Sequence, residues 1–121
     1  MHEVAICQSI LETVQEELSE DELSRVREIH LKVGKLSCVE PSILQNVFGF
    51  MIVDSPFAHT QLKIQLLDVI AECEMCGEKF EVEHYKFICP NCQRPTSKII
   101  QGNELQINKL ISEAPFYEEA N

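Results

Sequence analysis

The chain has 121 residues, which is enough for one compact domain or for one domain that carries a small appendage. Ten Lys and Arg against twenty Asp and Glu give a formal net charge of −10 at pH 7, which disfavours a nucleic-acid partner because phosphates would be repelled. No stretch of about 18 apolar residues occurs, and the first residues lack the features of a signal peptide. We therefore expect a cytoplasmic protein that does not enter a membrane.

Two segments show the apolar period of amphipathic helices. From Val4 to Leu18 apolar residues recur at spacings of three and four, and residues 19–22 interrupt the pattern. Glu40-Pro41-Ser42 predicts the start of a second helix, because Pro fits the first turn, and a broad apolar stripe follows as far as Ile52.

Three segments show the alternation of strands. Residues 29–33 alternate between apolar and polar side chains, and Gly34 ends that strand. Residues 62–71 predict a long strand whose phase shifts near Leu66 and Leu67, and a turn at Gly102-Asn103 precedes a further strand from about residue 104. The expected fold class is α/β (α+β), a small sheet with two helices packed on it.

Four of the six cysteines form two Cys-x-x-Cys pairs that are separated by twelve residues: Cys73, Cys76, Cys89 and Cys92. This spacing predicts a structural Zn(II) site with tetrahedral sulfur ligands, and residues 79–87 could form a small strand over it. The cluster lies between two predicted strands, so we expect an inserted zinc-ribbon domain at 73–101 within an α/β domain made of 1–72 and 102–121. A closed four-sulfur site has no open position for a substrate, and we expect no enzymatic activity.

The sequence Met1-His2-Glu3 is a second candidate metal site. A free terminal amine, the deprotonated amide nitrogen of His2 and the imidazole Nδ1 can close two fused chelate rings, and Glu3 can complete the set. Ni(II) and Cu(II) favour such planar nitrogen fields more than Zn(II) does.

Several motifs occur together in the order of one family. They are the terminal Met-His-Glu, Cys7-Gln8-Ser9-Ile10, Val33-Gly34-Lys35-Leu36-Ser37, Val39-Glu40-Pro41, the two cysteine pairs and Gly102-Asn103-Glu104-Leu105. By these motifs the chain resembles the HypA/HybF nickel-insertion proteins of NiFe hydrogenase maturation, and the resemblance covers nearly all of residues 1–111. It departs from the family pattern at Lys35, where Glu is common, and at Cys38, where Gly is common.

The resemblance implies a small metallochaperone with a transported Ni(II) and a structural Zn(II). Its partners would be the maturation GTPase HypB and the large subunit of NiFe hydrogenase, and in some bacteria the urease accessory proteins. Carried over by position, His2 is the essential nickel ligand and the Met1 amine and Glu3 are accessory, while the four paired cysteines hold zinc.

Other candidate residues and functions have simpler interpretations. His30 is expected on the polar side of a strand and Cys7 in the core, whereas the role of Cys38 is open. His59 and His84 are expected on the surface, with a secondary metal contact as the alternative for His59 and a place beside the zinc ligands for His84. The main functional alternative is a non-enzymatic zinc-ribbon adaptor that binds proteins. A thiol oxidoreductase fits less well, because a thioredoxin-like motif uses one cysteine pair at a helix start.

Overall fold

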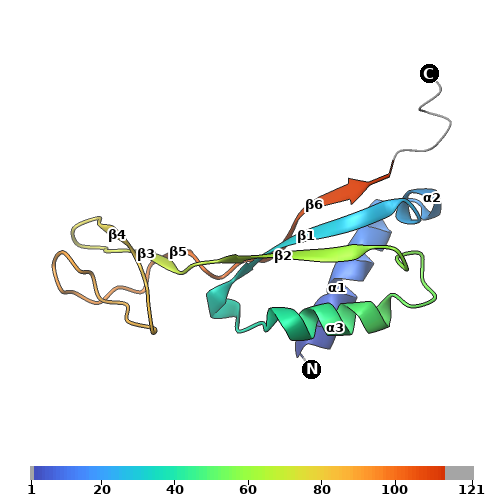
Figure 1. The fold of residues 1–121 in the computed structure, drawn as a ribbon. Coiled ribbons are helices and arrows are strands. Elements are labelled where there is room, and N and C mark those ends of the chain that lie inside the picture. The colour runs from blue at the N-terminus through green and yellow to red at the C-terminus, as the bar shows by residue number, and fades with distance from the viewer. Residues whose placement is uncertain (1, 114–121) are drawn as a thin grey trace, which may run out of the picture. The chain divides into compact units, whose positions relative to one another are not determined.

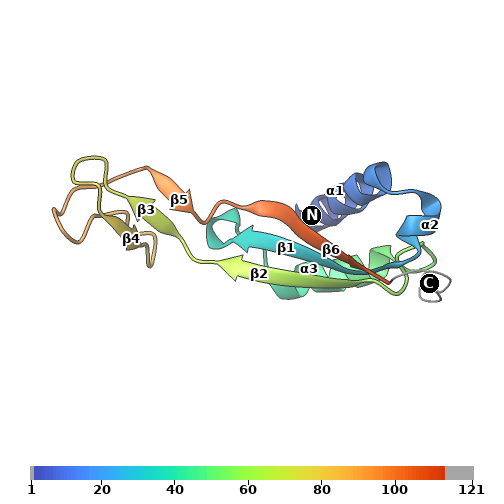
Figure 2. The ribbon, with the colours of Figure 1, turned by 90° about the horizontal axis from the view of Figure 1, so that it is seen from above.

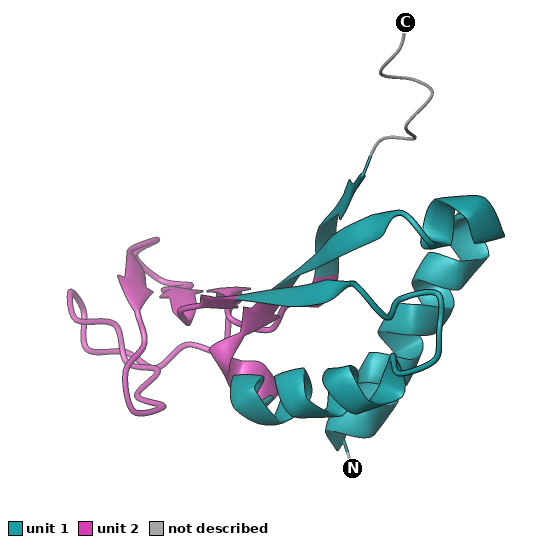
Figure 3. Cartoon of the chain, turned by 45° about the vertical axis from the view of Figure 1, so that its right-hand side comes forward, with its two compact units in different colours: residues 1–31, 39–64, 107–121 teal, residues 32–38, 65–106 magenta. Residues whose placement is uncertain are grey.

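The computed structural model describes residues 2–113 and divides the chain into two compact units (Figure 3). Unit 1 comprises residues 1–31, 39–64 and 107–121, and unit 2 comprises residues 32–38 and 65–106. A compact unit need not fold independently, so the domain limits expected at residues 73 and 101 stay a prediction. None of the described helices is long and apolar enough to cross a membrane.

Unit 1 is built on α1 (His2–Glu17) and α3 (Pro41–Met51), which lie side by side on one face of a sheet (Figure 1). Both helices were predicted from their apolar period, and α3 begins as expected, with Pro41 at its first turn and Glu40 as its N-cap. Residues 19–22 were expected only to interrupt the first helix. They form a short helix α2 (Glu20–Leu23), because Ser19 and Glu22 make a reciprocal capping box.

The sheet on which these helices pack has three strands in the order β2-β1-β6. Strand β1 (Val26–Gly34) runs parallel to β2 (Gln61–Leu67), and α3 connects them, whereas β6 (Leu105–Ser112) runs in the opposite direction (Figure 2). The amide of Gly34 donates to Glu104 and the amide of Glu113 donates to Arg25, as an antiparallel β1–β6 pair requires. The strand expected at 29–33 and that expected from residue 104 are therefore confirmed.

The core of unit 1 forms between these helices and the sheet. Its side chains come from the apolar stripes of α1 and α3, from the inward face of β1 and β2, and from the loop after α3. At the edge of this core the Thr60 hydroxyl donates to the carbonyl of Val26 at 2.8 Å, which satisfies a buried polar side chain. The buried residues include Cys7, Ile10, Leu11, Val14, Ile29, Leu31, Leu44, Phe48, Phe57 and Leu62.

Unit 2 contains a second sheet, with the strand order β4-β3-β5. Strand β3 (Ile70–Glu72) pairs antiparallel with β4 (Lys79–Glu81) and with β5 (Ile99–Gln101). The long strand predicted over 62–71 is broken between Leu67 and Ile70, close to the expected irregularity. A 3-10 turn, Lys35–Ser37, also belongs to this unit.

Two features of unit 2 differ from expectation. Strand β5 was not predicted, since three residues are too short for a recognisable alternation. The strand expected over 79–87 ends at Glu81, because the chain turns at Glu83–Lys86, where His84 and Tyr85 have φ of 55° and 59°.

Candidate metal centres

The four paired cysteines converge in unit 2. Their sulfur atoms all lie within 4.8 Å of one another, with Cys73 Sγ 3.4 Å from Cys92 Sγ and Cys76 Sγ 3.6 Å from Cys89 Sγ. A Zn(II) ion bound by four thiolates at about 2.3 Å would hold the sulfurs about 3.8 Å apart in a tetrahedron. The donor set and its spacing therefore fit a tetrahedral zinc ion, as the cysteine pattern predicted.

Two tight turns of the same form bring these sulfurs together. In each, the residue four positions after the first cysteine has a positive φ and donates its amide to that cysteine's carbonyl: Gly77 to Cys73 at 2.9 Å and Gln93 to Cys89 at 2.8 Å. In turn, the amide of Cys73 donates to Glu78 and that of Cys89 donates to Arg94. The chain is thus folded back so that each cysteine pair faces the centre.

Backbone amides in these turns favour the thiolate form. The amides of Cys76 and Met75 lower the pKa of Cys73 to about 6, and the amide of Glu78, with the Asn91 side chain, lowers the pKa of Cys76. At Cys92 the amide of Arg94 favours the thiolate, but the neighbouring sulfurs outweigh it and raise the pKa to about 12. Four thiolates so close together need a cation among them, which zinc would supply.

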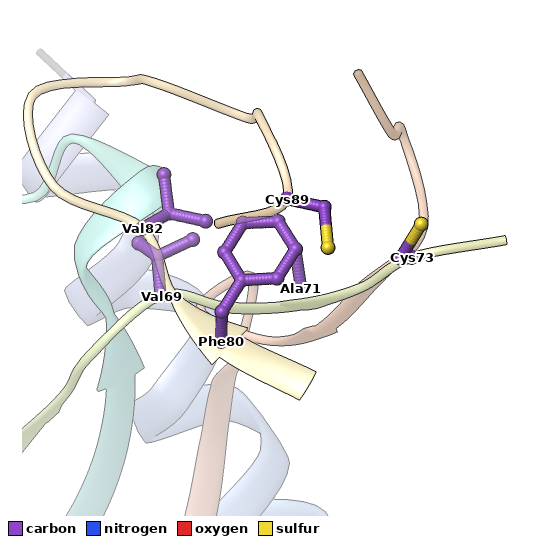
Figure 4. Close-up of a cluster of buried hydrophobic side chains, with 6 residues drawn as sticks. All are labelled: Val69, Ala71, Cys73, Phe80, Val82 and Cys89. Carbon is purple, nitrogen blue, oxygen red and sulfur yellow. The ribbon is translucent and has the colours of Figure 1, made fainter. Parts of the chain in front are cut away.

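The cluster is anchored in a small apolar core on one side only (Figure 4). Cys73 and Cys89 are 2% and 0% exposed beside Ala71 and Phe80, whereas Cys76 is exposed. The Asn91 amide donates to Cys76 Sγ at 3.6 Å, a contact that sequence reasoning missed although Asn91 lies within the second cysteine pair. So few apolar side chains give little stability of their own, so a metal bound by the four cysteines would stabilise this small core.

The predicted nickel segment opens helix α1. His2 is its first residue and is exposed, and Glu3 is half-buried in its first turn. The Glu3 carboxylate accepts its own amide and that of Glu40, 3.4 Å away, which lowers its pKa. Met1 lies outside the described residues. The contact with Glu40 was not expected, because it joins segments 37 residues apart in sequence.

The remaining candidate residues lie where the sequence predicted. Cys7 is fully buried, and His30 forms a 2.7 Å contact with Glu28 on β1. His59 and His84 are exposed, and the group of metal-binding side chains found among residues 2–113 consists of the four paired cysteines without a histidine. Cys38 is exposed at the end of the 3-10 turn, with a positive φ of 61°.

Comparison with known proteins gives a consistent result. The family model described as "Hydrogenase/urease nickel incorporation, metallochaperone, hypA" matches residues 1–111. A hydrogenase maturation factor HypA from Chlorobaculum parvum is 33% identical over 113 residues, which cover 93% of this chain and 100% of that protein. Another from Desulfitobacterium hafniense is 32% identical over 110 residues, which cover 91% of this chain and 96% of that protein.

Two solved structures share the fold. The solution structure of the Ni metallochaperone HypA from Helicobacter pylori superposes with a TM-score of 0.64 at 21% identity, covering 95% of this chain and 100% of that chain. A second solution structure of a HypA protein gives a TM-score of 0.68 at 22% identity, covering 95% and 98% of the two chains.

Proposed function

The chain belongs to the HypA family of hydrogenase-maturation nickel metallochaperones, and from that premise we propose that it binds Ni(II) through Met1, His2 and Glu3 and delivers it with the GTPase HypB. The recipient is the large subunit of NiFe hydrogenase. The family description also names urease, so urease is a second proposed recipient, reached through its accessory proteins. The observation that carries this proposal is a family match over residues 1–111, which includes both candidate metal sites.

The start of helix α1 supports the chemistry of the nickel site. Amides in the first turn of an α-helix have no carbonyl four residues earlier to bind. The backbone amide nitrogen of His2 is therefore not needed for a helical hydrogen bond. In the proposed chelate this amide loses its proton and binds Ni(II) together with the Met1 amine and the His2 imidazole. Nitrogen ligands in a planar arrangement select Ni(II) over Zn(II).

Glu3 supports release as well as binding. Besides its own amide, the Glu3 carboxylate accepts the amide of Glu40 at 3.4 Å, at the edge of α3, and it can leave that position without opening the core. A site of exposed ligands can be taken apart one ligand at a time by a partner, which delivery requires. Because these ligands bind nickel in their deprotonated forms, nickel affinity should fall as the pH is lowered.

The four-cysteine cluster has a structural role in this proposal. Zn(II) bound by Cys73, Cys76, Cys89 and Cys92 would cross-link the two turns of unit 2, and four sulfur ligands leave it no position for a substrate. We therefore propose that the protein is not an enzyme. Free thiols persist as metal ligands in a reducing compartment, which supports a cytoplasmic location.

The energy for delivery comes from another protein. The sequence has four glycines and no glycine-rich loop of the kind that cradles phosphates, so GTP hydrolysis is assigned to HypB.

The test compares two histidine variants that are both exposed in unit 1, His2→Ala and His59→Ala. Ni(II) is titrated into each zinc-loaded protein and binding is followed by calorimetry and by the absorption of planar nickel. We expect His2→Ala to abolish the planar band and tight binding, while His59→Ala behaves as the unmodified protein does. Nickel binding that survives His2→Ala would instead favour a zinc-ribbon adaptor.

A further inference from the structure

Helix α3 has one apolar face in the core and a second apolar face in solvent. Leu44 and Phe48 are 0% and 2% exposed, whereas Ile43 and Phe50 are 47% and 82% exposed, with Val47 half-buried between them. Residues at spacings of three and four share one side of a helix, so Ile43, Val47 and Phe50 form a continuous stripe. Exposed apolar stripes of this kind mark interaction surfaces.

The start of α3, which carries Ile43, lies beside the first turns of α1. Glu3 contacts the amide of Glu40, and Cys7 Sγ donates to the Leu44 carbonyl at 3.7 Å, so the start of α1 lies along the start of α3 (Figure 1). We call the surface formed by Ile43, Val47 and Phe50 the helical patch.

The surroundings of the helical patch are acidic. No Lys or Arg occurs in residues 1–24 or in residues 36–62, which include both helices. Helix α1 contains four glutamates, and α3 is uncharged but is preceded by Glu40 and followed by Asp54. An occupant must therefore bring apolar side chains and positive charge.

We propose that the helical patch docks the protein partner with which this chain exchanges nickel, and that the partner presents apolar side chains flanked by Lys or Arg. The inference rests on the proposed function, because it takes the proposed nickel segment at the start of α1 as the site of exchange. A partner seated on the patch lies next to Glu3, whose carboxylate reaches the first residue before α3.

The same charges argue against two other occupants. A second copy of this chain would bring glutamates against glutamates around the patch, and an anionic membrane surface would meet the same repulsion. Both become outcomes of the experiment, through light scattering and through binding to vesicles of anionic phospholipid.

The experiment measures binding of purified HypB from the same organism to the full-length, zinc-loaded protein. Phe50 is 82% exposed, so Phe50→Ala should leave the fold unaffected, and Ile43 is 47% exposed, so Ile43→Ala should lower stability only slightly. Ile111→Ala is the matched control, since Ile111 is 40% exposed on β6. We expect the dissociation constant to rise about 30-fold for Phe50→Ala, less for Ile43→Ala, and not at all for Ile111→Ala.

A second arm tests the charge. Asp54 has a φ of 61°, a conformation that Asn also tolerates, so Asp54→Asn removes the charge at the end of α3 while keeping the turn. We expect this variant to associate severalfold more slowly at low salt and the difference to disappear at high salt. Nickel binding, measured by the absorption band of planar Ni(II), should be the same in all four variants.

The outcomes separate this inference from the proposed function. If the unmodified protein binds HypB and the patch variants bind equally well, the helical patch is not the docking surface, although HypB stays the partner. If the unmodified protein does not bind HypB, both the partner and the docking proposal fail. Self-association or vesicle binding that Phe50→Ala abolishes, without an effect on HypB binding, would also overturn the inference.

Discussion

The carbonyl group of Gly102 occupies the place where a side chain on Gly34 would begin. A Cβ on Gly34 would lie 1.9 Å from the Gly102 oxygen, and one on Gly102 would lie 3.0 Å from the Cα of Val69. Gly102 also has a φ of 127°, which side chains rarely permit. The two backbones approach because the amide of Leu36 donates to Gly102 and the amide of Gly34 donates to Glu104.

Replacing Gly34 should therefore be costly. In Gly34→Ala the backbone at Gly102 must move and the two hydrogen bonds must lengthen, so we expect the free energy of unfolding to fall by about 3 kcal/mol. Chemical denaturation measures it. The control is Gly49→Ala in α3, where an added Cβ meets nothing within 4 Å, and helix propensity predicts a gain of about 1 kcal/mol. Equal stability of the two variants would contradict the close approach.

Replacing Cys38 by glycine should stabilise the folded protein. Its φ of 61° disfavours any residue with a Cβ, and its exposed Sγ makes a long hydrogen bond to the Leu36 carbonyl, at 3.7 Å. We expect Cys38→Gly to raise the free energy of unfolding by about 1 kcal/mol and Cys38→Ala, which keeps the Cβ, to leave it nearly unchanged. Thermal unfolding of both variants provides the measurement, and a gain in Cys38→Ala as large as in Cys38→Gly would rule out the backbone explanation.

Removal of zinc should unfold residues 70–101 of unit 2 and leave unit 1 folded. The apolar core around Phe80 is small and includes two of the cysteines, whereas unit 1 has a larger core of its own. After chelation we expect the amide signals of residues 70–101 to collapse in an NMR spectrum, while helical circular dichroism persists. Cys89→Ser should reproduce this loss, and Cys38→Ser should retain one zinc per chain. Persistent, dispersed signals from residues 70–101 in metal-free protein would contradict the structural role of the metal.

Alkaline pH should destabilise the protein through Cys7. Burial raises the pKa of this thiol to about 11 from an ordinary value of 9, so the folded state binds the proton more tightly than the unfolded state does. Its contribution is complete below about pH 9 and is lost as the pH rises towards 11, by on the order of 1 to 2 kcal/mol. Urea unfolding at several pH values, compared with Cys7→Ala, measures this contribution. The account fails if both proteins lose stability equally over that range.

The elements that could be predicted from sequence are those whose pattern repeats. Helices α1 and α3 bury side chains at spacings of three and four, and strand β1 buries mostly every second side chain. The spacing of the four cysteines is itself typical of a tetrahedral metal site. The capping-box pattern of Ser19 and Glu22 was also present in the sequence and could have indicated α2.

What could not be predicted depends on contacts between distant segments. Strand β5 exists because Ile99 and Gln101 pair with β3, and the pairing partner determines it more than its own sequence does. The contact of Glu3 with Glu40 and the approach of Gly34 to Gly102 join residues that are far apart in the chain. Both depend on how the sheet and helices pack, which no local pattern encodes.

The central claim, nickel binding by the chain terminus, is tested most directly by adding one residue ahead of Met1. The extension moves the amine away from the His2 imidazole, yet it leaves the fold and the four-cysteine cluster unchanged. Ni(II) is titrated into the native and the extended zinc-loaded proteins while planar nickel absorption is recorded. We predict that the band and tight binding appear only with the native terminus. Equal binding by both proteins would contradict the account.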